Sequence, residues 1–199
     1  MINLLSVFAF YSMLLDFDIK KAIAATAFLI EREGGTGDMF YLVKELYVAD
    51  RTALIKWGKS ITGDSLASMP KGPVVSGIYN LLKGEWKGSI QVQIEWNDVI
   101  QRGDGYSVVL RKHADTGILA ERENEVLDEA RQTIKAIRGS IPKWLHRNCP
   151  EWTDPGTSSI PIDPSTILRI AKKSEEEIRR IEEANEEIRL LNALLGARC

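Results

Sequence analysis

The sequence contains few residues that could do catalytic chemistry, and their spacing fits no common reaction. Its two histidines, His113 and His146, would have to supply the base of any serine hydrolase triad, but no Gly-x-Ser-x-Gly motif is present to expose a serine. His146 and Cys149 have the His-x-x-Cys spacing that could begin a metal site, yet a zinc site needs four ligands and two more are not evident. We therefore predict a protein that is not an enzyme and has no metal or cofactor.

A glycine-rich stretch, Arg102-Gly103-Asp104-Gly105, is the other feature that could indicate chemistry, since glycines cradle phosphates in nucleotide-binding loops. It lacks the lysine and the following helix of such a loop. It lies instead between two runs of β-forming residues, 99–100 and 106–110, and Asp-Gly between such runs predicts a β-hairpin. We therefore expect a turn here and no phosphate site.

The composition is that of an ordinary globular protein without the charge of a nucleic-acid binder. Of its 199 residues, 44% are hydrophobic and 27% are charged, which is enough apolar surface for one core. The formal net charge is −2 and no three lysine or arginine residues are consecutive, so we do not expect nucleic acid as a partner. Cys149 and Cys199 are too few for a disulfide framework, and unpaired thiols favour a cytoplasmic location.

The N-terminus is expected to form an apolar helix that packs on the core. Residues 2–15 are almost wholly apolar, but no basic residue precedes them and they run into Asp16 and Asp18, unlike a signal peptide. A stretch of about 14 residues is also too short to span a bilayer, so we expect no membrane association. An apolar patch that is covered only when a partner binds is the alternative.

Helical periodicity marks the body of the protein. The apolar residues of 39–57 form two stripes, which predicts a buried central helix that ends at Gly58. Pro73 is at a position typical of the first turn of a helix. Helices are expected over 19–30, 39–57, 73–82, 121–138 and 141–148.

Two further segments could be extended. Residues 66–69 form a short stretch after a polar turn and are a candidate strand. Residues 90–96 alternate apolar and polar side chains, which predicts a strand by period, although a helix leading into the hairpin is the alternative.

The C-terminal quarter has a different character. Residues 150–162 are rich in turn-forming types and predict a linker-like loop. Beyond it, Ser174 and Glu177 have the spacing of a capping box at the start of a strongly charged helix. Apolar residues repeat every seven positions along this helix, which allows a homo-oligomer through a short coiled coil; a solvated helix with one apolar edge folded onto its own domain is the alternative.

Together these elements predict an α+β fold that is mainly α, with a compact helical domain, a small β-hairpin and a charged C-terminal helix. The expected organisation is an N-terminal apolar helix (1–17), a central domain (18–149), a linker-like loop (150–162) and a C-terminal helical extension (163–199).

Four motifs follow one another along the central domain: Tyr47-Val48-Ala49-Asp50-Arg51, Ile61-Thr62-Gly63-Asp64, Gly72-Pro73-Val74 and Tyr79-Asn80-Leu81-Leu82. This series resembles the SocA-like Panacea antitoxin domain, and the resemblance covers most of the chain after Phe17. The sequence departs from the family pattern at Lys71, where a histidine is expected, and at Lys44-Glu45-Leu46, where a run of leucines is usual.

The resemblance implies an antitoxin of a type II toxin–antitoxin system, which neutralises a cognate protein toxin by direct binding and has no enzyme activity. The alternative is a phage- or prophage-associated interaction protein that binds a host factor. Three tryptophans, Trp86, Trp144 and Trp152, are candidate anchors, because tryptophan is enriched at binding hot spots.

The motif residues could serve the scaffold or contact the partner. Because Asp50 and Arg51 share a helix face with Tyr47, they could pair with each other or tie down the turn around Gly63. Both roles stay open for the whole set of motif residues, which is Tyr47, Asp50, Arg51, Thr62, Gly63, Asp64, Gly72, Pro73 and Tyr79.

Overall fold

The computed structural model describes residues 15–196, so the expected helix over 1–17 lies almost entirely outside the described residues. The observed class is α+β and mainly α, as predicted. The helices are α2 (Ile19–Glu31), α3 (Met39–Trp57), α4 (Ser76–Lys83), α5 (Ile90–Val99), α6 (Glu121–Ala136), α7 (Ile141–Asn148), α8 (Pro164–Ile170) and α9 (Glu175–Gly196), with a 3₁₀ turn at Thr116–Ile118. The strands are β1 (Thr36–Asp38), β2 (Leu66–Ser68), β3 (Val74–Val75), β4 (Ile100–Arg102), β5 (Ser107–Leu110) and β6 (Ile160–Ile162).

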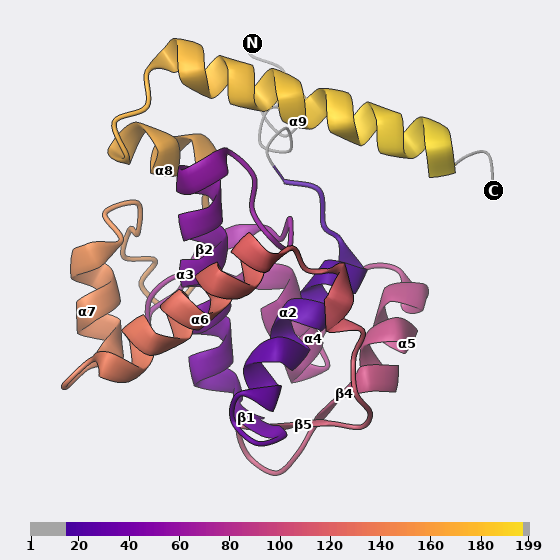
Figure 1. Ribbon diagram of the computed structural model, residues 1–199. Coiled ribbons are helices and arrows are strands. Elements are labelled where there is room, and N and C mark those ends of the chain that lie inside the picture. The colour runs from indigo at the N-terminus through magenta and orange to yellow at the C-terminus, as the bar shows by residue number, and fades with distance from the viewer. Residues whose placement is uncertain (1–14, 197–199) are drawn as a thin grey trace.

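Helix α3 runs through the middle of the molecule and contacts α2, α4, α6 and α8 (Figure 1). Asp38 begins the helix by accepting a hydrogen bond from the backbone N–H of Phe40 (2.8 Å). Gly58 ends it in the left-handed conformation, with φ of 77°. Side chains from both apolar stripes, including Leu46, Tyr47 and Leu54, are fully buried, which confirms the predicted central helix. No described helix is long and apolar enough to cross a membrane.

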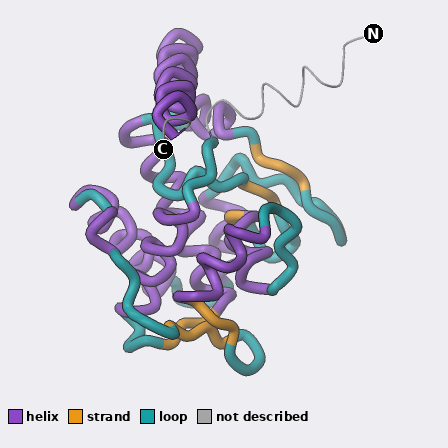
Figure 2. The backbone as a smooth tube through the Cα atoms, turned by 90° about the vertical axis from the view of Figure 1, so that its right-hand side faces the viewer, coloured by secondary structure: helices purple, strands orange, loops and turns teal. Residues whose placement is uncertain are grey.

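The described residues form two small antiparallel sheets, with strand orders β1-β5-β4 and β3-β2-β6. The predicted hairpin is confirmed, because β4 and β5 pair with Gln101 opposite Val109. Strand β1 adds to its edge through Gly37 and Val108. This sheet lies at the end of the molecule opposite α9 (Figures 1 and 2). The hairpin therefore sits beside the start of α3, where the N–H of Met39 donates to the carbonyl of Tyr106 (2.8 Å).

The alternating segment 90–96 is helical. Ser89 caps α5 by accepting a hydrogen bond from the N–H of Gln91 (3.2 Å). The buried residues Trp96 and Val99 are three apart on one face, while Ile90 and Ile94 are exposed. The strand predicted from the period was therefore wrong, and the helix alternative is confirmed; the period-two pattern mixes the exposed Ile90 and Ile94 with the core residue Trp96.

The prediction that a helix starts at Pro73 was wrong by three residues. Val74 and Val75 form β3, which pairs with Ala67 and Leu66 of β2, and α4 begins only at Ser76. The first turn of α4 is stabilised from outside, because the carboxylate of Asp64 accepts hydrogen bonds from the N–H groups of Gly77 and Ile78. A cap that comes from a distant residue sets the start of this helix.

The stretch 150–162, expected to be a linker-like loop, is partly built into the domain. Residues 160–162 form β6 and pair with β2, with Ile162 opposite Leu66. Glu151 is buried near α3, and the indole N–H of Trp152 donates to the carbonyl of Met69 (3.0 Å). The pairing partners of this segment lie about 90 residues earlier in the chain, so its composition alone did not reveal the strand.

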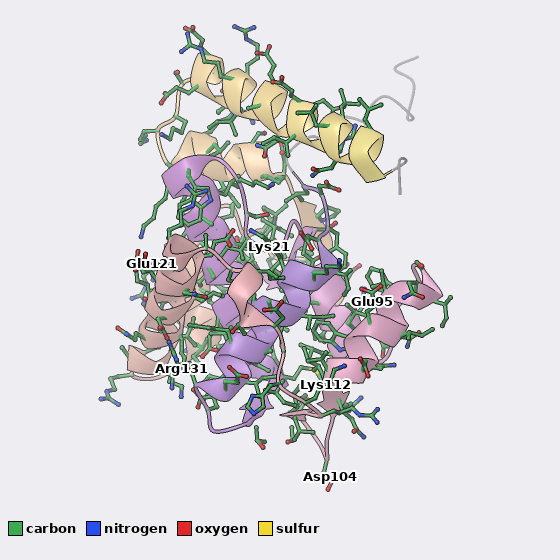
Figure 3. All side chains as sticks on the ribbon, turned by 45° about the vertical axis from the view of Figure 1, so that its right-hand side comes forward. Lys21, Glu95, Asp104, Lys112, Glu121 and Arg131 are labelled. Atoms are coloured by element: carbon green, nitrogen blue, oxygen red, sulfur yellow. The ribbon has the colours of Figure 1, made fainter. Side chains whose placement is uncertain are left out.

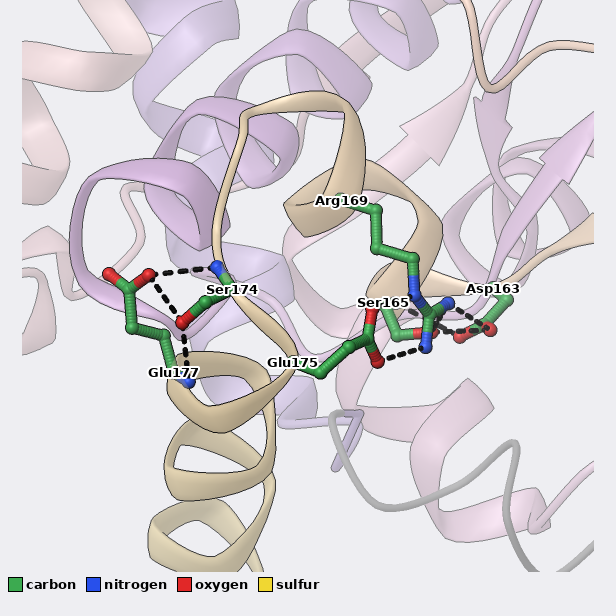
Figure 4. A network of polar contacts seen from close by, with 6 residues as sticks. All are labelled: Asp163, Ser165, Arg169, Ser174, Glu175 and Glu177. Atoms are coloured by element: carbon green, nitrogen blue, oxygen red, sulfur yellow. Dashed lines mark hydrogen bonds and ion pairs between the residues drawn. The ribbon is translucent and has the colours of Figure 1, made fainter.

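The C-terminal helices α8 and α9 are joined by a polar network and pack on the body (Figure 4). Arg169 of α8 donates to Glu175 of α9 (2.7 Å), and Ser174 and Glu177 form the predicted capping box. Ile178 is buried, and the side-chain amide of Asn185 donates to the carbonyl of Gly58 (2.8 Å). The first half of α9 thus folds one edge onto its own domain, whereas its second half exposes apolar side chains, namely Ile188, Leu190, Leu191 and Leu194.

Candidate interaction site

The carboxylate of Asp50 holds the turn that follows α3. It accepts hydrogen bonds from the backbone N–H groups of Ile61 (2.9 Å) and Thr62 (3.0 Å), and from the hydroxyl of Thr62. Asp50 is buried, and burial raises its pKa to about 6 against the opposing effect of these hydrogen bonds. Its side chain is therefore fully used within the domain.

Gly63 and Asp64 complete this turn. Gly63 has φ of 65°, and a Cβ at this position would lie 1.8 Å from the carbonyl oxygen of Asp16, so only glycine fits. Asp64 caps α4 at 2.8 and 2.7 Å, as described above, and burial raises its pKa to about 7. The turn thus ties the end of α3 to the start of α4.

Tyr47 and Arg51 meet at one buried carboxylate, that of Glu151. The hydroxyl of Tyr47 donates to Oε1 (2.6 Å), and Arg51 donates to the same oxygen through Nε (2.6 Å) and to Oε2 through Nη2 (3.3 Å). Burial raises the pKa of Tyr47, and the nearby Glu151 charge adds to the rise. Sequence reasoning missed Glu151, because it lies in the segment interpreted as a loop and nothing local distinguishes it from a surface glutamate.

Gly72 and Pro73 accept hydrogen bonds from a buried lysine. The ammonium group of Lys44 donates to their carbonyl oxygens at 2.8 and 2.9 Å, and burial lowers its pKa to about 7. Tyr79 remains half-exposed, with the ammonium group of Lys83 5.2 Å from its ring centre. Apart from Tyr79, the predicted motif residues are thus used inside the domain or covered by it, which favours the scaffold role over contact with a partner.

The three tryptophans considered as anchors are also half-buried and packed against the core. Trp152 stacks on His146 with ring centres 3.6 Å apart, and Trp86 donates through its indole N–H to the carbonyl of Ser89 (2.9 Å). These contacts favour internal packing. Two aromatic residues are exposed in the described part of the chain: Tyr106 in the hairpin (64%) and Tyr41 on α3 (42%).

Two clefts open at the hairpin end of α3, and Tyr106 lines both. The first, here called the acidic cleft, has a volume of about 860 Å³. Asp104 at the hairpin tip lines it, as does Glu33, which pairs with Arg131 of α6; Asp104 and Arg131 are labelled in Figure 3. Its charged and aromatic lining consists of Glu33, Asp38, Tyr41, Glu45, Asp104, Tyr106 and Lys135.

The second, here called the apolar cleft, has a volume of about 340 Å³. Its walls are Met39, Phe40, Val43, Met69, Pro70, Val74, Tyr79 and Tyr106, with Lys44 and Lys71 as the two charged residues. An apolar pocket beside a polar one, with an exposed tyrosine between them, is a suitable surface for the anchor residues of a partner protein.

The match to a protein-family model covers residues 42–153, more than half of the chain, and the model describes the "Antitoxin SocA-like, Panacea domain". The chain belongs to this SocA-like Panacea family. Searches of curated proteins and of solved structures gave no match.

The Panacea match includes both sides of the contact between Arg51 and Glu151. It begins in α3, three residues after Met39, and ends just after Glu151 and Trp152, whereas β6, α8 and α9 lie outside it. Of the charged residues at which the sequence analysis expected a departure from the family pattern, Glu45 lines the acidic cleft, and Lys44 and Lys71 line the apolar cleft.

Proposed function

We propose that this protein is an antitoxin that neutralises a cognate protein toxin by direct binding, as part of a type II toxin–antitoxin system. The match to the Panacea antitoxin family over residues 42–153 carries the proposal. The proposed place of action is the cytoplasm, where the toxin would be made, and the proposal includes no catalytic step.

The distribution of buried and exposed residues supports binding at the surface of a rigid domain. The side chains of Asp50, Asp64 and Arg51 make hydrogen bonds to other residues of the domain. The hairpin end instead presents two adjacent clefts and the exposed ring of Tyr106. Pockets with aromatic rims are typical of surfaces where a few anchor residues provide most of the binding energy.

The test is co-expression of the full chain with the product of the neighbouring toxin gene, scored by growth and by copurification of a complex. We expect rescue of growth together with a stable complex. Toxicity that persists when the antitoxin is folded and abundant, with no complex, would contradict the proposal.

A truncated variant separates the body from the C-terminal helix. A chain that ends at Lys173 removes α9 but keeps β6 and α8, which pair with β2 and pack on α3. If the hairpin end binds the toxin, this variant should still neutralise it, provided that circular dichroism shows a folded protein. Loss of rescue in a folded variant would assign the contact to α9.

A further inference from the structure

Glu45 carries a buried carboxylate that no described residue pairs with. Glu45 is 1% exposed, and its Oε1 atom has no hydrogen-bond partner within residues 15–196. Buried polar atoms of native proteins nearly always have a partner, and for a carboxylate the lack of one is costly. Glu45 lines the acidic cleft, so a small movement of the lining would bring its carboxylate into contact with a group bound there.

The cations near the acidic cleft pair with groups other than Glu45. Arg131 and Lys135 of α6 both pair with Glu33, the former at 2.6 Å. Lys44, next to Glu45 on α3, points its ammonium group at the carbonyls of Gly72 and Pro73. Burial raises the pKa of Glu45 and the charges of Lys135 and Arg131 lower it, but no basic side chain in residues 15–196 forms an ion pair with its carboxylate.

The rest of the lining adds negative charge and aromatic surface. Asp38 of β1 and Asp104 of the hairpin contribute two more carboxylates, against the single cation Lys135 among the lining residues. Tyr41 and Tyr106 offer exposed rings on which a planar cation can stack. The described residues contain no group of three or more ligands suited to a metal ion. The charge and shape of the cleft thus fit an organic cation.

We infer that the acidic cleft accepts a basic side chain, arginine or lysine, of the bound toxin, and that Glu45 is the carboxylate that pairs with it. This inference rests on the proposed function for the identity of the partner, but the cation preference of the cleft does not. A charge-assisted hydrogen bond in a nearly dry site is strong enough to make this contact an anchor of the interface. It also supplies Glu45 with the partner that the free protein lacks.

The first experiment needs no toxin. N-acetyl-arginine N-methylamide is titrated into the isotope-labelled full chain, and amide resonances are followed by NMR. We expect saturable shifts at residues that line the acidic cleft, such as Gly37, Tyr106 and Gly139. The neutral analogue N-acetyl-norleucine N-methylamide should give no such shifts. Shifts that are scattered over the surface, or equal shifts with the neutral analogue, would overturn the inference.

The second experiment uses Glu45→Gln, which keeps the size of the side chain but removes its charge, and Glu125→Gln at an exposed position of α6 as the matched control. Circular dichroism and the thermal midpoint verify that both variants fold. Glu45→Gln should lower the affinity for the capped arginine by about 10-fold and the affinity for the toxin by about 10- to 100-fold, the range expected for a charged hydrogen bond. Glu125→Gln should change neither. An unchanged affinity of folded Glu45→Gln for both ligands would overturn the inference.

Replacement of each toxin arginine and lysine by alanine then identifies the partner side chain. One of these toxin variants should lose affinity for the wild-type protein but show little further loss with Glu45→Gln, which is the signature of direct coupling. Additive losses for every basic residue of the toxin would contradict the pairing. Capped arginine bound in the cleft of a protein that binds no toxin would support the cation site and would count against the proposed function alone.

Discussion

Arg51 and Glu151 are 100 residues apart in sequence, yet Nε of Arg51 lies 2.6 Å from Oε1 of Glu151. The same oxygen accepts the hydroxyl hydrogen of Tyr47. One buried carboxylate therefore fastens the segment after α7 to the central helix α3. The side chain of Glu151 is inaccessible to solvent and that of Arg51 is 18% exposed, so the pair is shielded from the screening that weakens surface ion pairs.

Removal of the charge at this junction should destabilise the fold. Glu151→Gln leaves Arg51 with a weaker partner in a nearly dry site, and we expect the free energy of unfolding to fall by about 1–3 kcal/mol. Urea denaturation at neutral pH provides the measurement. Glu129→Gln breaks the exposed pair with Lys56 and is the matched control, with an expected loss below about 0.5 kcal/mol. Equal losses in the two variants would contradict the role assigned to Glu151.

Asp50→Asn should loosen the turn after α3. An amide presents one oxygen where the carboxylate presents two, so it cannot accept all of the bonds from Ile61 and Thr62. We expect a loss of about 2–4 kcal/mol and faster hydrogen exchange at the amides of Ile61 and Thr62. Asp115→Asn, which affects an exposed carboxylate that accepts from the N–H of Gly117, should cost less than about 1 kcal/mol. Unchanged exchange at Ile61 and Thr62 would rule out this account of the turn.

Gly63→Ala should cost more than the same change at Gly105, although both glycines have a positive φ. A methyl group at Gly105 meets no atom within 4 Å, so the expected cost is the backbone strain of about 1 kcal/mol. At Gly63 the methyl group would also lie 1.8 Å from the carbonyl oxygen of Asp16, which forces the chain before α2 to move. Thermal and urea unfolding of the two variants should differ by at least about 2 kcal/mol. A similar cost at both positions would show that the approach of Asp16 is easily relieved.

The pH dependence of stability should contain a contribution from Glu45. Burial raises its pKa from 4.5 to about 7, with a smaller effect of Glu33, so the folded protein keeps a proton that the unfolded chain releases. This contribution is fully present below pH 4.5 and is lost as the pH rises through about 7. It is on the order of 3 kcal/mol, since one pKa unit is worth 1.36 kcal/mol.

Urea unfolding of the wild type and of Glu45→Gln at pH 5 and pH 8 checks this prediction. The variant should show a smaller loss of stability between the two values, because its amide does not titrate. The other charged groups at the cleft, which are Glu33, Asp38, Asp104, Arg131 and Lys135, are the same in both proteins and cancel in the comparison. Parallel pH profiles would show that Glu45 keeps an ordinary pKa in the fold.

Local chemistry alone determined several elements of this protein. The Asp-Gly turn between β-forming runs gave the β4–β5 hairpin, Gly58 ended α3, and Ser174 with Glu177 capped α9. In each case the groups that interact lie within a few residues of one another, so their spacing in the sequence already contains the geometry. The two apolar stripes of α3 likewise predicted a helix surrounded by other elements, because apolar side chains on two sides of a helix must both be buried.

Only the tertiary structure decided the features whose partners are distant in the chain. Val74 and Val75 became a strand because β2 pairs with them, and α4 started at Ser76 because Asp64 satisfies its first N–H groups. Glu151 became a central residue through contacts made 100 residues away. Lys44 and Glu45 are also neighbours in the sequence, but their environments differ. Lys44 donates to the carbonyl of Gly72, whereas Oε1 of Glu45 has no partner within residues 15–196 and Glu45 lines a cleft. The sequence could not show this difference, because the packing of the surrounding elements sets the environment of each charge.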